Sequence, residues 1–368
     1  MAIKDYEMVI GLEVHVELNT STKIFCSCST KYGGEPNTQC CPVCMGMPGT
    51  LPVLNKKVVE YGIKAGIATN CKIATITKMD RKNYFYPDLP KAYQISQFDM
   101  PLCKDGFIEI DCKDGKKTIG ITRIHIEEDA GKLIHKENGD TLIDFNRSGV
   151  PLIEIVSEPD IRSVEEAKEY LQKLRGLLMF AEVSECKMNQ GAFRCDVNLS
   201  VRKKGDLNFG TRTEMKNLNS FQFIGNAIEY EFKRQIEELE SGNEIIQETR
   251  KYDQVSKKTI SLRGKGGAAD YRYFPEPDML PIQISEDVIE ACRTEMPMLI
   301  DERLDMYRTK YGLSDYDANQ LISNKEIADF FEATLNYTNH AKIVANIIAT
   351  ELFRLIILDN IEIKVSAE

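Results

Sequence analysis

The sequence IGLEVHVEL, from Ile10 to Leu18, decides the fold that we expect for this chain. Apolar and polar side chains alternate along it, with Ile10, Leu12, Val14, Val16 and Leu18 in one set and Glu13, His15 and Glu17 in the other. Because consecutive side chains of a β-strand point to opposite faces, the stretch predicts a strand with one apolar face and one acidic face that carries an imidazole. That polar face is either ordinary solvent exposure or the floor of an active site.

Four later stretches repeat the pattern and add carboxylates and arginines. In ITRIHIEED, His125 and Glu127 share a face, and Glu128 and Asp129 follow at the end of the strand. Glu154 lies between apolar neighbours in VPLIEIVSEPD, and FRCDVNLSVR and TRTEMKNLN alternate in the same way. Any one of these strands is typical of an antiparallel sheet with one wet side. Together they favour a cluster of carboxylates with one imidazole, which would hold Mg²⁺ for phosphoryl transfer, and arginines that neutralise the phosphoryl group.

The order of strand and helix patterns predicts two domains. Residues 1–155 contain mainly short strand patterns separated by turns such as KDG, which are typical of antiparallel hairpins. A first helix is expected over SVEEAKEYLQKLRGLLMF, with a capping-box pattern at its start, and a second from Phe221 to about Ser241, ended by Gly242. The sequence therefore predicts an α+β catalytic domain with a largely antiparallel sheet in residues 1–283, followed by an all-α helical domain in residues 284–368.

Composition excludes several classes of protein. The 368 residues are 42% hydrophobic and 28% charged, as in a globular protein, and no apolar run predicts a transmembrane helix or signal peptide. A cytoplasmic location without a membrane partner is therefore expected. The net charge of −10 argues against nonspecific coating of nucleic acid, although one local basic surface can still bind an RNA.

Five of the eleven cysteines lie between residues 26 and 44. Cys26 and Cys28 form one close pair, and Cys41 and Cys44 form another twelve residues later. Two such pairs supply four thiolates to a tetrahedral Zn²⁺, and a site with four protein ligands has a structural role. Free thiols are the alternative interpretation, and Cys40 is an alternative ligand to Cys41.

No glycine-rich phosphate-binding motif occurs in the sequence. The basic loop RGKGGAADYR is a candidate to close over phosphates through Arg263, Lys265 and Arg272, and its alternative is a plain surface loop. The aromatic stretch DRKNYFYPDLPKAYQISQ either stacks on the end of a nucleic acid or packs against the core.

Several stretches together resemble the B subunits of aspartyl/glutamyl-tRNA(Asn/Gln) amidotransferases. They are IGLEVHVEL, EPN…GMPGTLPVLN, DRKNYFYPDLPKAYQISQ, ITRIHIEEDAGK, NRSGVPLIEIVSEPDIRS, RCDVNLSVR, EMKNLNSF and DYRYFPEPD, and they span most of residues 8–282. The resemblance implies a catalytic fold similar to glutamine synthetase and a complex of three different subunits. The A subunit, a glutaminase, releases ammonia from glutamine. The C subunit braces the A and B subunits. The B subunit uses Mg-ATP to phosphorylate the side-chain carboxylate of Glu on tRNA(Gln) or Asp on tRNA(Asn), and ammonia then displaces phosphate.

The resemblance also implies roles for particular residues. The Mg²⁺ ligands of the family correspond to Glu13, His15, Glu127, Glu128 and Glu154, of which Glu128, Glu13 and His15 are expected to be catalytic. Glu17 is expected to be peripheral, and the four-cysteine zinc site occurs in some members of the family. The family continues into a tail domain that contacts the tRNA body, whereas this sequence ends at Glu368, so the tail is expected to be absent.

Two other functions compete with this one. A noncatalytic, zinc-stabilised tRNA-binding scaffold would bind tRNA without Mg-dependent ATP turnover. A free-standing amide ligase would act on a small carboxylic acid without tRNA.

Overall fold

A computed structural model describes residues 3–262, 270–352 and 354–355. The chain divides into two compact units. The first comprises Met1–Leu178 and Val183–Glu295, and the second comprises Met179–Glu182 and Met296–Glu368. In the described ranges, none of the helices is long and apolar enough to cross a membrane.

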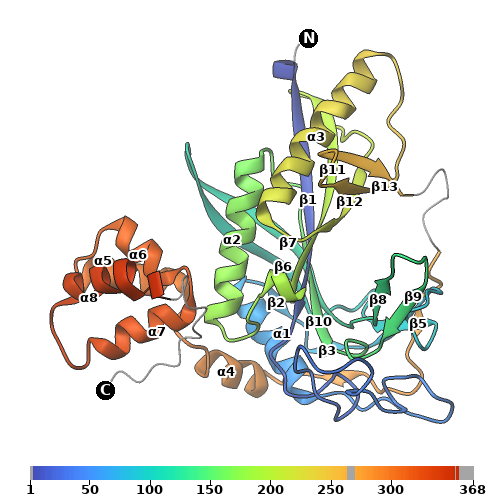
Figure 1. The fold of residues 1–368 in the computed structure, drawn as a ribbon, viewed down its shortest axis with the longest axis horizontal. Helices are drawn as coiled ribbons and strands as arrows, with labels where there is room; N and C mark the ends of the chain where they lie inside the picture. Colours follow the sequence, from blue (N-terminus) through green and yellow to red (C-terminus); the bar gives the residue numbers. More distant parts are fainter. Residues whose placement is uncertain (1–2, 263–269, 353, 356–368) are drawn as a thin grey trace. The chain divides into compact units, whose positions relative to one another are not determined.

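The first unit is built on a nine-stranded sheet in the order β14-β13-β12-β11-β1-β10-β7-β6-β2 (Figure 1). Its strands are β1 (Tyr6–Glu17), β2 (Lys72–Ile73), β6 (Cys103–Cys112), β7 (Gly115–Glu128), β10 (Pro151–Ser157), β11 (Phe193–Lys203), β12 (Thr213–Leu218), β13 (Thr249–Asp253) and β14 (Lys258–Ser261). Every neighbouring pair is antiparallel except β12 and β13. The prediction of an α+β fold with a largely antiparallel sheet is therefore confirmed.

Three small sheets complete the β structure of this unit. They pair β15 (Phe274–Pro275) with β4 (Asp80–Asn83) and β5 (Tyr93–Ser96), β16 (Ile282–Gln283) with β3 (Ile76–Thr77), and β8 (Lys132–His135) with β9 (Thr141–Asp144). Short 3-10 turns occur at Ile3–Asp5 and Met188–Gln190.

Strand β1 lies at the centre of the large sheet and has the two faces predicted from its alternation. Ile10, Val14 and Val16 are fully buried, whereas Glu13 and His15 are partly exposed. β1 pairs with β10 on one side and β11 on the other, so residues from distant parts of the chain come to lie beside it. The apolar face anchors the strand, and the polar face carries the candidate site.

Helices α1 (Lys56–Ala68), α2 (Val164–Phe180) and α3 (Phe221–Glu240) lie alongside the large sheet (Figure 1). Both predicted helices are confirmed. Ser163 accepts a hydrogen bond from the backbone N–H of Glu166, as predicted, whereas the Glu166 carboxylate accepts from the N–H of Arg162. Ser220 caps α3, and Gly242 follows its end at a φ of 79°.

Helix α1 was not predicted, because its sequence contains two glycines that weaken a helical pattern. Packing explains them. A Cβ at Gly62 would lie 2.4 Å from Leu102, and one at Gly66 would lie 2.5 Å from the Cys103 sulfur. The glycines therefore let α1 approach β6 and β7 closely, and tertiary contact outweighs their low helix propensity.

The division into units lies later than the boundary predicted after Gln283. Helix α4 (Glu286–Thr294) belongs to the first unit, where it packs on α1. Cys292 of α4 is buried, and its thiol contacts the backbone oxygen of Glu60. A helical pattern alone does not reveal which neighbour a helix packs against, so α4 was assigned to the wrong side of the boundary.

The second unit is helical, with its own apolar core. Its helices are α5 (Ile300–Thr309), α6 (Asp315–Ile322), α7 (Lys325–Thr334) and α8 (Ala341–Ile347), followed by a π-helical turn at Ile348–Leu352. Tyr307 and Phe331 are fully buried at the centre of this core, with ring centres 5.1 Å apart and ring planes at 67° in an edge-to-face contact. The core also contains Phe180, from the end of α2.

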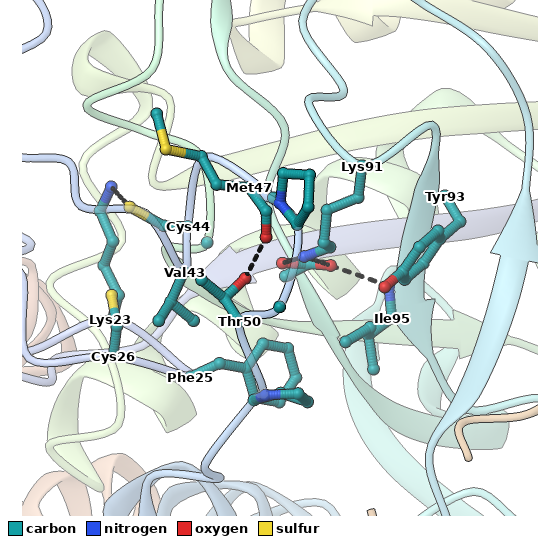
Figure 2. A pocket seen from close by; sticks show the side chains of 16 residues that line it. Lys23, Phe25, Cys26, Val43, Cys44, Met47, Thr50, Lys91, Tyr93 and Ile95 are labelled. Atoms are coloured by element: carbon teal, nitrogen blue, oxygen red, sulfur yellow. Dashed lines mark hydrogen bonds and ion pairs between the residues drawn. The ribbon is translucent and has the colours of Figure 1, made fainter. Parts of the chain in front are cut away.

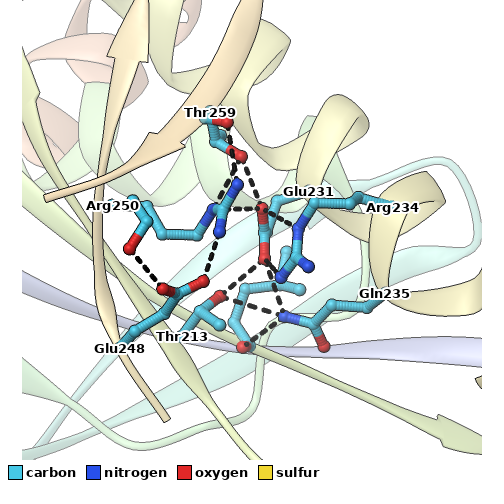
Figure 3. A network of polar contacts seen from close by, with 9 residues as sticks. Thr213, Glu231, Arg234, Gln235, Glu248, Arg250 and Thr259 are labelled. Carbon is cyan, nitrogen blue, oxygen red and sulfur yellow. Dashed lines mark hydrogen bonds and ion pairs between the residues drawn. The ribbon is translucent and has the colours of Figure 1, made fainter. Parts of the chain in front are cut away.

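A buried polar network ties α3 to the edge of the large sheet (Figure 3). The Glu231 carboxylate is fully buried and accepts hydrogen bonds from Thr213, Arg234 and Thr259, and Arg250 lies 3.3 Å away. Burial alone would raise the pKa of Glu231, but the hydrogen bonds from Arg234 and Thr259 outweigh it and lower the pKa. Since Thr213 begins β12, the network holds the strand that carries Glu214 and Lys216.

Replacing Glu231 with Gln should destabilise the protein by about 3 kcal/mol, because it leaves the mostly buried Arg234 without its carboxylate partner and removes one of the two carboxylates that pair with Arg250. Urea unfolding measures this, and Glu237→Gln on the exposed part of α3 is the control. Because the pKa of Glu231 is lower in the folded protein, its carboxylate stabilises the fold fully at pH values above the unfolded-state pKa near 4.5. This stabilisation is lost as the pH falls through the pKa of the folded protein. Equal unfolding midpoints in the two variants would contradict the prediction.

Candidate functional site

Three titratable side chains form a row across the polar face of the sheet. His15 on β1 is paired with Glu154 on β10, which is paired with His125 on β7. The Glu154 carboxylate lies 3.5 Å from His15 Nε2 and 3.2 Å from His125 Nε2. The antiparallel register, with β10 between β1 and β7, therefore places one carboxylate between two imidazoles.

Glu127 joins this row from β7. Its carboxylate lies 3.5 Å from His15 Nε2 and 3.7 Å from His125 Nε2. One donor atom from each of His15, Glu127 and Glu154 falls within 4.8 Å of the others, a spacing that suits a single cation. Two carboxylates and an imidazole are ligands for a divalent metal ion.

The two imidazoles and the two carboxylates shift each other's pKa. Burial lowers the pKa of His125, but the Glu154 and Glu127 carboxylates outweigh it and raise the pKa to about 9. Burial raises the pKa of Glu154, yet His125 and His15 outweigh it and bring the pKa well below its ordinary value. The carboxylates are therefore ionised at neutral pH and are available to a cation.

A second cluster lies one step along the same face. Glu13 on β1 is paired with Asp196 on β11, and Glu214 on β12 is paired with Asn198, which donates a hydrogen bond to Glu13. Donor oxygens of Glu13, Asp196 and Glu214 lie within 4.8 Å of one another. Burial and the charge of Glu154 raise the pKa of Glu13, so the two clusters affect each other electrostatically.

Lys216 binds this second cluster. Its ammonium lies 2.9 Å from both Asp196 and Glu214. Burial would lower the pKa of Lys216, but these two carboxylates outweigh it and raise it. A cation thus already neutralises part of the acidic cluster, and the sequence pattern had only placed Lys216 on a strand face.

A cleft of about 750 Å³ lies over this polar face, and His15, Glu127, Asp196 and Lys216 are among its lining residues. Asp129 is also in the lining, and it lies 2.8 Å from Arg194 and 3.5 Å from Arg147. Glu17 lines the same cleft, where burial and the charge of Asp129 raise its pKa to about 7. Glu17 therefore lines the candidate site, whereas a peripheral position was expected from the sequence.

Glu128 does not join the other predicted Mg²⁺ ligands. Because β7 remains a strand through its last residue, Glu128 points to the face opposite Glu127. Its carboxylate accepts a hydrogen bond from Ile95 N–H at 2.9 Å and binds the Lys91 ammonium at 2.5 Å. Glu128 and Lys91 line a separate cavity of about 220 Å³, and Lys91 is labelled in Figure 2. The placement of Glu128 in the Mg²⁺ cluster is thus corrected.

The predicted phosphate-binding residues are only partly described. Arg263 and Lys265 lie outside the described residues. Arg272 has an exposed side chain near Asp270 rather than in the cleft. The aromatic stretch from Asp80 to Gln97 forms β4 and β5, with Phe85 82% exposed and Tyr86 49% exposed at the loop between them.

The four predicted zinc ligands come together, and Cys40 lies apart from them. The sulfur atoms of Cys26, Cys28, Cys41 and Cys44 all lie within 4.8 Å of one another. Tetrahedral zinc with Zn–S bonds of 2.3 Å needs sulfurs about 3.8 Å apart, and the Cys41–Cys44 pair is at 4.0 Å. The Cys40 thiol instead donates to the backbone oxygen of Asn37 at 3.2 Å.

Electrostatics favour a thiolate at Cys44. A hydrogen bond with Cys26 lowers the pKa of Cys44 to about 4, and the buried Lys23 ammonium lies 3.5 Å from its sulfur. Thiolates are the form that binds zinc, so the donor set fits a structural Zn²⁺.

Comparisons with known proteins give one consistent result. The profile of the GatB/GatE catalytic domain matches residues 8–290. Two proteins named as B subunits of aspartyl/glutamyl-tRNA(Asn/Gln) amidotransferase, from Caldicellulosiruptor bescii and Caldicellulosiruptor saccharolyticus, are each 59% identical to the chain over 354 residues. A protein of the same name from Caldanaerobacter subterraneus is 58% identical over 351 residues. These similarities cover 95 or 96% of the chain and 74% of each relative.

Replacing Cys41 with Ser should abolish binding of zinc in a 1:1 ratio, because it removes one of four clustered thiols, whereas Cys40→Ser should retain it. Metal analysis of reduced, freshly purified protein measures this difference. Zinc loss from Cys40→Ser, or zinc retained by Cys41→Ser, would contradict the assignment of the ligands.

Proposed function

Because the chain belongs to the family of aspartyl/glutamyl-tRNA(Asn/Gln) amidotransferase B subunits, with a GatB/GatE catalytic domain, we propose that it phosphorylates and then amidates a carboxylate carried on tRNA. The substrate is Glu-tRNA(Gln), Asp-tRNA(Asn) or both. The protein uses Mg-ATP and acts in the cytoplasm with two different partners, the glutaminase, or A subunit, of the complex and its C subunit. Its catalytic domain is similar in fold to glutamine synthetase. The observation that supports this reaction is the pair of carboxylate clusters under one cleft.

The donor atoms of the two clusters fit two divalent cations. Glu13, Asp196 and Glu214 offer only oxygens, which Mg²⁺ prefers. His15, Glu127 and Glu154 offer a mixed set that also accepts a divalent ion. Cations held here would neutralise the phosphate oxygens of ATP and the attacking carboxylate, which otherwise repel each other.

The side chains of this site position groups rather than supply a base. A carboxylate oxygen of the substrate attacks the γ-phosphorus, and the bond from that phosphorus to the oxygen of ADP breaks. No proton is removed in this step, so His15 acts as a ligand. His125 fixes Glu154 through its Nε2 contact at 3.2 Å. The product is an acyl phosphate, whose phosphate is a much better leaving group than oxide.

Ammonia completes the reaction by attacking the acyl carbon, and the C–O bond to phosphate breaks. If nitrogen arrives as ammonium, it must first lose a proton. We assign that proton to Glu128, because its carboxylate lines the separate cavity on the opposite face of β7 from the phosphoryl site. The Lys91 ammonium, 2.5 Å from Glu128, neutralises the carboxylate between turnovers.

The reaction is tested by amidation of both misacylated tRNAs with this chain alone and with its partner subunits. ATP-dependent formation of Gln-tRNA or Asn-tRNA is expected only with the partners or with added ammonia. Binding of tRNA without Mg-dependent ATP turnover would instead favour a zinc-stabilised scaffold. Turnover of small carboxylic acids without tRNA would favour a free-standing ligase.

Replacing Glu154 with Gln should lower ATP-dependent amidation at least about 100-fold, because it removes the carboxylate between the two imidazoles. Glutaminase activity of the partner should be unchanged in the same complex. Glu165→Gln, on the exposed part of α2, is the control and should keep full amidation. Full amidation by Glu154→Gln would rule out the assigned cation site.

Replacing Glu128 with Gln should lower amidation supported by ammonium salts at neutral pH, because no carboxylate then accepts the proton. The rate relative to wild type should recover as pH rises and free ammonia replaces ammonium. Steady-state rates between pH 7 and about 9 measure this recovery. A deficit that is the same at every pH would show that Glu128 has no role in this proton transfer.

A further inference from the structure

One lysine of the cleft is held by aromatic rings instead of by a carboxylate. Lys82 lies on β4 and lines the cleft of about 750 Å³ together with His15 and Glu127. Its ammonium is 4.9 Å from the centre of the Tyr271 ring and 5.9 Å from that of Tyr84. Aromatic rings attract a cation through their negative faces and leave its hydrogen-bond donors unused.

The partly buried cations around Lys82 already have partners. Arg194 and Arg147 bind Asp129, and Lys216 binds Asp196 and Glu214. Within the described part of the chain, the Lys82 ammonium has no hydrogen bond and no ion pair. Two further lysines of the cleft lining, Lys31 and Lys132, are exposed. Lys82 is thus the partly buried cation whose three N–H donors remain available.

The aromatic surroundings of Lys82 are fixed by contacts of their own. The backbone N–H of Asn83 donates a hydrogen bond to the backbone oxygen of Tyr271 at 2.9 Å. The side-chain amide of Asn83 donates a second one to the backbone oxygen of Arg272 at 2.8 Å. Tyr273 stacks on Phe98 with ring centres 4.3 Å apart. The segment that supplies these rings is therefore attached to β4, and the ammonium is held in position before a ligand arrives.

The charge of Lys82 faces the first carboxylate cluster. Burial would lower the pKa of Lys82, but the charges of Glu127 and Glu154 contribute to raising it. The ammonium therefore stays protonated at neutral pH. When cations neutralise those carboxylates, the field that Lys82 experiences becomes less negative, and an anionic ligand becomes its natural partner.

We propose that Lys82 binds the non-bridging oxygens of the phosphoryl group that passes from ATP to the substrate carboxylate. This inference rests on the proposed function. Lys82 donates hydrogen bonds and transfers no proton, while the phosphorus gains a bond to the carboxylate oxygen and loses its bond to the oxygen of ADP. A face with several carboxylates repels a phosphate, and a cation in the lining of the same cleft offsets that repulsion. The tyrosine rings explain how this charge is held in place without a carboxylate partner.

The inference is tested with Lys82→Met in the full complex with the partner subunits. Equilibrium binding of Mg-AMPPNP, which has the γ-phosphoryl group, is compared with that of Mg-ADP, which lacks it. Affinity for Mg-AMPPNP should fall at least about tenfold, as expected for loss of a charged hydrogen bond, while affinity for Mg-ADP is unchanged. Lys82→Arg should retain part of the affinity for Mg-AMPPNP. Lys113→Met, at an exposed position in the turn between β6 and β7 and outside the cleft lining, should bind both nucleotides as wild type does.

Three results would overturn the inference. The first is an unchanged affinity of Lys82→Met for Mg-AMPPNP, and the second is an equal loss of affinity for Mg-AMPPNP and Mg-ADP. The third is a raised KM for the misacylated tRNA with normal binding of Mg-AMPPNP, which would assign Lys82 to the substrate carboxylate. Circular dichroism of both Lys82 variants checks that they are folded, and Lys82→Arg provides the same comparison if the Met variant unfolds. A wild-type complex that binds no Mg-AMPPNP and amidates no tRNA would refute the proposed function, which is a different result from any of these three.

Discussion

Mutual repulsion between carboxylates on one face of the central sheet is the constraint on which the rest of the site depends. Glu13, Glu127, Glu154, Asp196 and Glu214 come from five neighbouring strands of that sheet. Opposed side chains of adjacent strands are about 5 Å apart, so like charges there destabilise the fold unless cations intervene. His15, His125 and Lys216 supply those cations in the protein alone. The same places are where the proposed divalent ions would bind, in the gaps between carboxylates that repel each other.

The apolar face of the sheet is what keeps this arrangement in register. A slip of one residue in β1 would turn Ile10, Val14 and Val16 toward the cleft and send Glu13 and His15 into the core. Helices α1 and α3 cover the apolar side, and the buried Glu231 network fixes the outer strand β12. Hydrophobic burial therefore determines the positions of polar groups that lie on the other side of the same strands.

The periodicity of the sequence was enough to predict much of this structure. It predicted the two faces of β1, the helices α2 and α3 and the mainly antiparallel sheet. The spacing of the cysteines predicted the cluster of four thiols, and the motifs predicted the family that the comparisons confirm. Pairing was not predictable, because strand order and register depend on contacts between residues far apart in the chain. Asp196, Glu214 and Lys216 were recognised as polar strand positions, but only the register brings them to Glu13. Lys82 was missed for the same reason, since Tyr271 follows it by almost two hundred residues.

Glu127 and Glu128 show what a single residue step contributes to the proposed reaction. As neighbours at the end of β7, they point to opposite faces, one toward the cleft and the other toward the cavity that contains Lys91. Their Cα atoms are separated by one peptide unit, or about 3.8 Å. The backbone of the sheet nevertheless lies between the two carboxylates, so nitrogen that loses its proton at Glu128 has to pass the end of β7 before it attacks an acyl phosphate formed at the cleft. This separation keeps the Glu128 carboxylate away from the phosphorus, where it would compete with the carboxylate of the substrate.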